Sequence, residues 1–128
     1  MFRQDYFDRL IEQFARSVAR VVQLIRRQDL DDADRELALA EQAIGAPPGL
    51  EHIDPASAAM VLGNGDKVVL LAQLADLRAD AADARGAAAD AARHRARALA
   101  LLDCARPLQL TQEAADLRER LTSGQKPS

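Results

Sequence analysis

The sequence has few aromatic residues and almost no cysteine. Among its 128 residues there are no Trp, one Tyr, three Phe and a single cysteine, Cys104. One cysteine excludes a disulfide within the chain, and it fits a reducing cytoplasm, which we predict as the location of the protein. A chain of this length forms at most one domain, with a core of moderate size.

Long apolar runs are missing as well. The longest, VVLLAQLA at residues 68–75, is far shorter than the roughly 20 apolar residues of a membrane-spanning helix. Charged residues interrupt the N-terminal segment, so it does not resemble a signal peptide. We therefore expect a soluble protein with no membrane partner.

No segment shows the alternation of apolar and polar residues that is typical of a β-strand. Apolar residues instead recur at intervals of three and four, and segments rich in Ala, Leu and Arg favour helix. We predict an all-α fold of about five to six helices, arranged as antiparallel hairpins. One domain covers residues 1–122, and residues 123–128 form a flexible tail.

Asp, Thr, Gly and Pro mark the predicted helix boundaries. The first helix covers about residues 5–27. The predicted N-terminal caps are Asp29 or Asp31, Asp54, Asp66 and Thr111, and the predicted stops are Gly45, Gly63 and Pro107. Residues 67–105 could form one rod, because a single Gly costs only about 1 kcal/mol inside a helix. We favour a break near Gly86, which folds two alanine-lined faces together.

Charge is unevenly distributed along the chain, although the formal net charge is only −3. Residues 1–28 carry a net charge of +3, whereas residues 29–66 carry a net charge of −8. A basic segment beside an acidic one indicates pairing within the chain or between subunits as readily as an outside partner.

Two segments repeat a pattern of small residues. A predicted turn stands five residues before the first alanine of each copy, at Gln28 and at Gly86. The alanines are Ala33 and Ala40 in the first copy and Ala91 and Ala98 in the second. This spacing resembles the second helix of a tetratricopeptide repeat (TPR). The match is partial, because Arg95 replaces the large apolar residue Leu37 and the copies are 58 residues apart instead of about 34.

The opening MFRQDYFDRLIEQ is similar to the start of a family of uncharacterised bacterial proteins with TPR-like helices. Its members begin with a closely similar Met-Phe-Arg-Gln-Asp-Tyr stretch. They continue with a repeat-like hairpin and a Leu-rich helix, as at KVVLLAQLADL here. The resemblance covers about residues 1–105. It implies a fold, and it brings no activity, cofactor or catalytic residue.

All four aromatic residues lie within the first fourteen positions. Phe7 and Phe14 belong to an apolar stripe, and we expect this face to pack on the hairpins. Two interpretations of the other aromatic residues stay open: they are intramolecular core, or the N-terminal end contacts a partner or a second copy. On the second interpretation, the partner-binding residues are Phe2, Tyr6 and Leu10, with Arg9 and Arg16 as charges at the rim.

Residues with catalytic potential do not form a recognisable pattern. His52 and His94 are the only histidines, and we identify no nucleophile or acid to accompany them. His94 and Cys104 are ten residues apart, nearly three turns of one helix, so they cannot share a site there. We expect His94 to be a structural residue or to lie at the edge of a pocket.

Charged residues of the second half are expected to be solvated. Asp80 and Asp83 lie on one helix face without the Glu-x-x-His motif of a di-iron site. The cluster of Arg93, Arg95 and Arg97 lacks aromatic neighbours that would stack on bases, so we do not expect a nucleic-acid partner. We predict neither a metal site nor a cofactor.

These observations favour a non-enzymatic protein–protein interaction module, a TPR-like adaptor or scaffold that self-associates as a homodimer. Two alternatives stay open. The chain is a structural subunit of a larger assembly, or it binds a small ligand in a pocket near His94.

Overall fold

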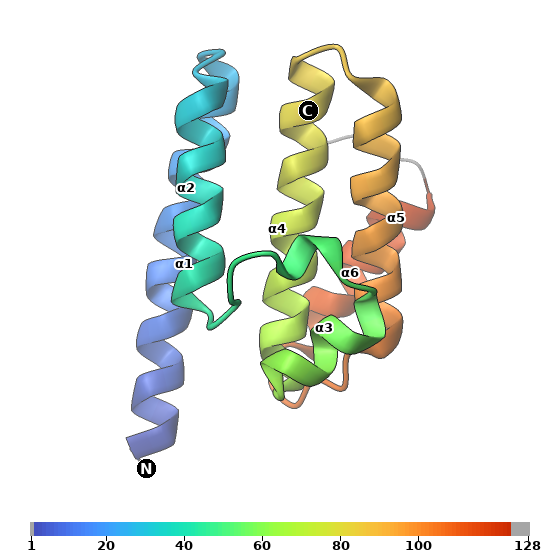
Figure 1. Cartoon of the computed structure of the whole chain (residues 1–128). Helices are drawn as coiled ribbons and strands as arrows, with labels where there is room; N and C mark the ends of the chain where they lie inside the picture. Colours follow the sequence, from blue (N-terminus) through green and yellow to red (C-terminus); the bar gives the residue numbers. More distant parts are fainter. Residues whose placement is uncertain (1, 124–128) are drawn as a thin grey trace.

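Six α-helices and one 3-10 turn make up the protein in a computed structural model that describes residues 2–123, with side chains described from residue 4 (Figure 1). The elements are α1 (Phe2–Arg26), α2 (Leu30–Ala43), η1 (Leu50–His52), α3 (Pro55–Leu62), α4 (Gly65–Ala84), α5 (Ala88–Cys104) and α6 (Thr111–Thr122). The predicted all-α fold is therefore confirmed for the described residues, and its helices pack as antiparallel neighbours. The predicted tail lies outside the described residues, apart from Ser123.

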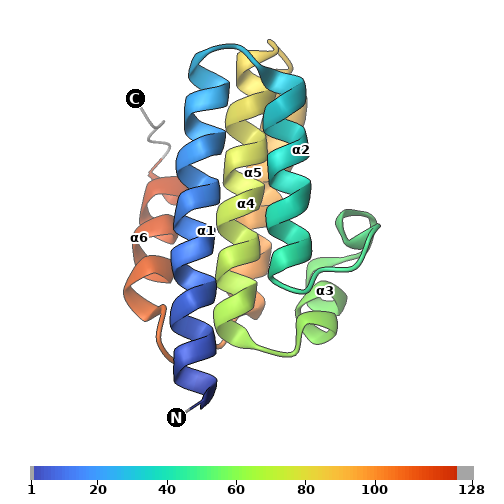
Figure 2. The same ribbon diagram turned by 90° about the vertical axis from the view of Figure 1, so that its left-hand side faces the viewer.

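Two long hairpins form the body of the molecule. Helices α1 and α2 form the first, α4 and α5 form the second, and α4 is the inner helix that contacts both α1 and α2 (Figures 1 and 2). Helix α6 packs on α4 and α5. The connection between the hairpins carries η1 and α3, and α3 contacts the second hairpin. Helix α4 is thus the central element of the core.

The two hairpin turns have the same geometry. Gln28 and Gly86 both adopt positive φ, +64° and +78°. In each turn the next residue donates its N–H to the carbonyl five residues back: Asp29 to Leu24 at 2.9 Å, and Ala87 to Ala82 at 2.8 Å. This is the Schellman arrangement, which ends a helix through a left-handed residue. The predicted break near Gly86 is confirmed, and so is its equivalence to the turn at Gln28.

Phe7 and Phe14 of α1 share the main core with Ala98 of α5, whereas Ala91 of α5 belongs to a second, smaller cluster with Ala79 and Ala82. Phe7 and Phe14 are buried in the main apolar cluster, which confirms that this face of α1 packs on the hairpins. Ala91 and Ala98 of α5 are 1% and 0% exposed. Because alanine adds so little bulk, α5 lies close against α4 (Figure 1).

The predicted cap positions are confirmed for α2 and α3 and wrong for α6. Asp29 occupies the position before α2, yet its carboxylate accepts no backbone N–H. Thr111 is the first residue of α6, and Leu110 precedes it. Asp54 is confirmed as the cap of α3, since its carboxylate accepts the N–H of Ser57 at 3.0 Å.

The failed cap at Asp66 reveals a long-range contact. Asn64, not Asp66, caps α4. Asp66 is buried, and its carboxylate accepts the N–H groups of three consecutive residues in the α5–α6 loop, Leu108, Gln109 and Leu110. The prediction is wrong because the partners lie more than 40 residues away, where local spacing gives no signal.

Gly65 allows the same loop to approach α4. A β-carbon at position 65 would overlap the backbone of Arg106. Together, Gly65 and Asp66 hold the α5–α6 loop against the first turn of α4, and so they position α6.

Candidate functional site

The predicted partner-binding residues do not all lie on the surface. Tyr6 is 56% exposed, and Arg9 and Arg16 are exposed on the same helix. Leu10 is only 5% exposed and belongs to the apolar core, so its prediction as a partner-binding residue is wrong. The side chain of Phe2 lies outside the described residues. The interpretation that every aromatic residue is core is wrong for Tyr6.

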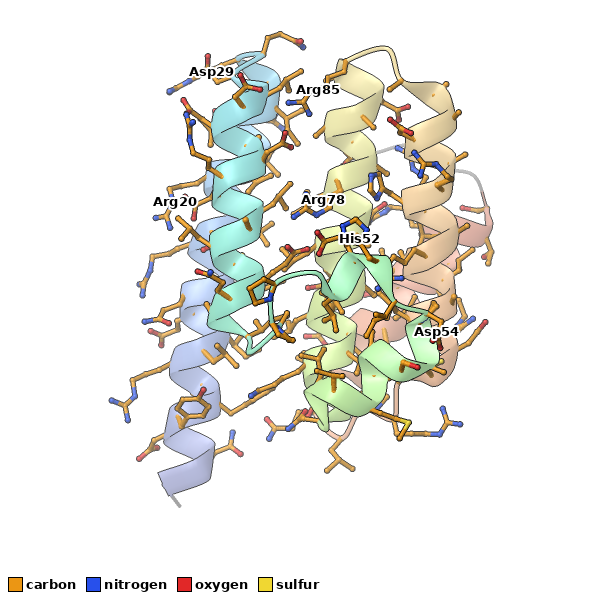
Figure 3. The ribbon with its side chains drawn as sticks, viewed as in Figure 1. Arg20, Asp29, His52, Asp54, Arg78 and Arg85 are labelled. Atoms are coloured by element: carbon orange, nitrogen blue, oxygen red, sulfur yellow. The ribbon has the colours of Figure 1, made fainter. Side chains whose placement is uncertain are left out.

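Acidic residues of α2 are neutralised within the chain. Arg78 of α4 binds Glu41 through two N–H groups at 2.7 and 3.1 Å. Arg85 of α4 binds Asp34 at 2.8 Å and Asp31 at 3.2 Å. Both arginines point from α4 toward α2 (Figure 3). The acidic segment therefore pairs mainly with the second hairpin and not with the basic first helix.

The arginines of α1 are left largely without such partners. Arg20 pairs with Glu36 at 2.9 Å. Within the described residues, no carboxylate oxygen lies within 4.0 Å of Arg9, Arg16, Arg26 or Arg27. Arg9 and Arg16, together with Tyr6, are called the α1 outer face below. It is an exposed surface whose two arginines form no salt bridge within 4.0 Å in the described chain, although Asp5 and Glu12 lie one turn away on the same helix.

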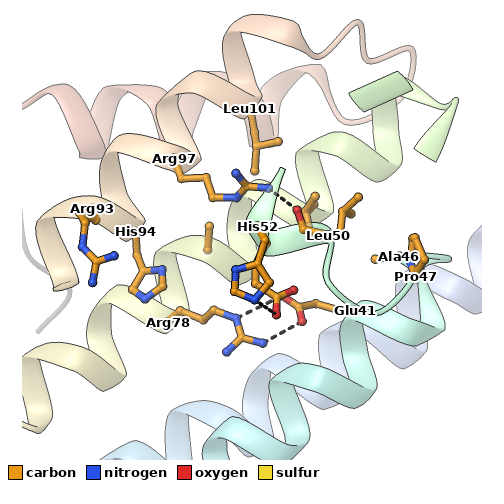
Figure 4. A pocket seen from close by; sticks show the side chains of 13 residues that line it. Glu41, Ala46, Pro47, Leu50, His52, Arg78, Arg93, His94, Arg97 and Leu101 are labelled. Carbon is orange, nitrogen blue, oxygen red and sulfur yellow. Dashed lines mark hydrogen bonds and ion pairs between the residues drawn. The ribbon is translucent and has the colours of Figure 1, made fainter. Parts of the chain in front are cut away.

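A cavity of about 250 Å³ opens between the end of α2, η1, α4 and α5 (Figure 4). Its apolar walls come from Ala46, Pro47, Leu50, Leu71, Ala75 and Leu101, and its charged or polar lining from Glu41, Glu51, His52, Arg78, Arg93, His94 and Arg97. The expectation that His94 lies at the edge of a pocket is confirmed.

Arg97 builds one wall of this cavity. Its two terminal nitrogens donate to the carbonyl oxygens of Ile53 at 2.7 Å and Leu50 at 2.9 Å, which holds η1 over α5 (Figure 4). The sequence gives no local signal for this contact, because the carbonyls lie more than 40 residues before the arginine. Sequence reasoning identified His94 but missed the segment that closes its pocket.

The arginine cluster of α5 does not form one solvated face. Arg93 pairs with Asp90, one turn earlier on the same helix. Arg95 points the other way and binds Asp80 at 3.1 Å and Asp83 at 2.6 Å. The expectation that Asp80 and Asp83 are solvated is wrong for Asp80, whose side chain is only 19% exposed, whereas Asp83 stays exposed while it binds Arg95.

These contacts belong to a partly buried ionic cluster. Asp76, 3% exposed, binds Arg120 of α6. Burial, reinforced by the charge of Asp76, raises the pKa of Asp80 to about 6, although Arg95 and Arg120 oppose the shift. Burial also raises the pKa of Asp76. The cluster joins α4, α5 and α6 through charges, in a region where the rest of the core is apolar.

No match was found for this chain among protein-family models, curated proteins or solved structures. The resemblance of the opening segment to a family with TPR-like helices therefore stays a prediction, while the all-helical character is established by the fold. No helix in the described part of the chain has the length and apolar character needed to cross a bilayer. Among residues 2–123, no group of three or more His, Cys, Asp or Glu could hold a metal ion.

Proposed function

We propose that the protein is a non-enzymatic interaction module, a TPR-like adaptor or scaffold, and that it binds a protein partner through the α1 outer face. One observation carries this proposal. Arg9 and Arg16 lack a carboxylate partner in the described chain, although the chain has many acidic residues that pair elsewhere. Tyr6 adds an exposed aromatic ring to the same helix, 6.0 Å from the Nζ atom of Lys67.

The partner that fits this surface presents carboxylates beside an apolar group. Guanidinium groups bind carboxylates through paired hydrogen bonds, and tyrosine is a frequent anchor residue at protein interfaces. A second copy of this chain fits less well, because the α2 carboxylates Glu41 and Asp34 are already bound within each molecule. Self-association therefore becomes an outcome of the test and not its premise.

A photo-crosslinking experiment locates the contact on the surface. A photoreactive residue replaces Gln13, an exposed neighbour of Arg9 and Arg16 on α1, in one variant and the exposed Arg118 of α6 in a matched control, and both are irradiated in a lysate of the native cell. We expect a crosslinked protein from position 13 only, and peptide mapping should place the crosslink beside Asp or Glu residues. Arg16→Glu should remove this product, because it reverses a charge on the α1 outer face.

Other results would overturn the proposal. They are equal crosslinking at positions 13 and 118, a product that Arg16→Glu leaves unchanged, or no product at all. If the crosslinked protein is the chain itself, the acidic-partner assignment is wrong, and the solution mass from analytical ultracentrifugation then gives the oligomeric state.

A further inference from the structure

The cavity is lined by Glu41 and Glu51 as well as by Arg78, Arg93 and Arg97, and Arg97 is the arginine among these three that forms no ion pair within the described residues. Arg97 donates to two backbone carbonyls, which are neutral groups. Among the described residues, no carboxylate oxygen lies within 4.0 Å of this arginine. A guanidinium has five N–H groups, so three of those on Arg97 remain for another acceptor. Arg78 differs, because Glu41 binds it through two hydrogen bonds.

His94 offers a further donor to the same cavity. It lies on α5, one turn before Arg97, and no described residue forms a hydrogen bond with its ring (Figure 4). Burial, and then the positive charges of Arg78, Arg93 and Arg97, lower the pKa of His94. The ring is therefore neutral near pH 7, and one of its nitrogens carries a proton that it can donate.

Several apolar side chains also line the cavity. Leu71 and Ala75 of α4 and Leu101 of α5 line it, and Leu50 closes it from η1. The volume of about 250 Å³ lies just below the roughly 300–1,000 Å³ that is usual for sites of drug-sized ligands. The cavity thus has room for a small molecule with one polar end.

We propose that this cavity binds a small carboxylic acid with an apolar body. The carboxylate accepts hydrogen bonds from Arg97 and His94, and Arg93 adds positive charge at the rim. The apolar body rests on Leu71 and Leu101. The site is separate from the proposed protein-binding surface, because none of its lining residues belongs to α1.

Binding is tested on the full chain with hexanoate and benzoate, and with 1-hexanol and benzyl alcohol as neutral counterparts. NMR titrations should show saturable binding of one carboxylate per chain, at least tenfold tighter than binding of the matching alcohol. The ring signals of His94 should shift, and its pKa should rise when hexanoate is bound, because the anion stabilises the protonated ring. No saturable binding of either acid at millimolar concentrations, or equal binding of the alcohols, would overturn the proposal.

Three variants locate the site. His94→Ala should weaken hexanoate binding roughly tenfold or more, because a hydrogen bond to a charged group is lost. Arg93→Ala, at a mostly exposed position, should weaken it several-fold without affecting folding. Arg118→Ala, a surface arginine of α6 outside the cavity, should leave the affinity unchanged. Unchanged affinity in both cavity variants, with folding verified by circular dichroism, would contradict the assignment.

Discussion

The two hairpins have turns of the same geometry, but they differ in the polarity of the side chains at equivalent positions. Aligned by the turns at Gln28 and Gly86, they place residues 58 positions apart in equivalent sites. Three partly buried apolar residues of α1 then correspond to three aspartates of α4: Val18 to Asp76, Val22 to Asp80 and Ile25 to Asp83. Leu37 of α2, fully buried, corresponds to Arg95 of α5. The second hairpin thus carries charged side chains at positions where the first hairpin carries apolar ones.

Where the second hairpin has an arginine in place of a leucine, it also has aspartates in place of the apolar residues on the preceding helix. Arg95 is tolerated at the position of Leu37 because Asp80 and Asp83 face it, at 3.1 and 2.6 Å. Partly buried ion pairs add little net stability, since desolvation offsets attraction, but the loss of one partner is costly. The ionic version also provides Asp76, which Arg120 of α6 binds. The second hairpin thereby gains a charged attachment point for α6.

The largest effect is expected when arginine, the residue at position 95 of the second hairpin, is placed at the equivalent position 37 of the first hairpin without the aspartates that accompany it. Leu37→Arg places a guanidinium where no carboxylate faces it, and it should cost about 4 kcal/mol of unfolding free energy or more. Leu39→Arg is the matched control, because Leu39 of the same helix is 58% exposed, and it should change stability by less than about 0.5 kcal/mol. Urea unfolding followed by circular dichroism measures both. Similar values for the two variants would refute the comparison.

The reverse transfer should cost less and should be reversible. Arg95→Leu leaves Asp80 and Asp83 without their partner, and we expect a loss of about 2–3 kcal/mol in urea unfolding. Adding Asp80→Val and Asp83→Ile recreates the apolar contact of the first hairpin. The triple variant should return to within about 1 kcal/mol of the wild type or exceed it. A triple variant no more stable than Arg95→Leu would show that the two interfaces are not interchangeable.

The pH dependence of stability should arise from the ionic hairpin. The pKa of Asp80 is about 6 in the folded protein, against 3.8 as its ordinary value. The folded state therefore binds more protons than the unfolded state between about pH 4 and 6, and this contribution to stability is lost as the pH rises through that range. In the wild type, this effect should lower the free energy of unfolding by on the order of 1–2 kcal/mol as the pH rises, a value reduced because Asp80 is partly solvated. Asp80→Asn should abolish this decrease. Urea unfolding at pH 4, 5, 6 and 7 measures it. An identical profile for wild type and variant would contradict the shift.

The smallest effects on stability are expected at the two equivalent turns, at Gln28 and Gly86. Gly86→Ala should cost about 1 kcal/mol, since an L-residue at positive φ is strained and no atom crowds the added β-carbon. Gln28→Gly should stabilise by less than about 1 kcal/mol, because glycine relieves the strain but has more freedom in the unfolded chain. Thermal unfolding should therefore shift in opposite directions. Shifts of the same sign would show that the turns are not equivalent.

Local patterns predicted those features whose causes are local. The apolar stripe with Phe7 and Phe14, the cap at Asp54 and the break near Gly86 each depend on residues within a few positions, and the structure confirms them. Ala33 and Ala91 each follow their turn by five residues, and this equal spacing also predicted that the two hairpin turns are equivalent.

Features that depend on distant partners could not be predicted in this way. Arg95 was expected to be solvated because its aspartates lie on another helix, and Arg97 gave no sign that it holds η1. Leu10 was assigned to the surface because the apolar stripe of α1 is broad. Only the packed structure shows which part of that stripe is covered.

The contact of Asp66 with the α5–α6 loop has a consequence for the order of assembly. A single carboxylate receives three successive amides, and it stands in the first turn of α4. These three hydrogen bonds therefore need the first turn of α4 to be in place, although the loop follows α5 in the chain. The amide protons of residues 108–110 consequently report by hydrogen exchange on fraying of a helix that begins some forty residues earlier.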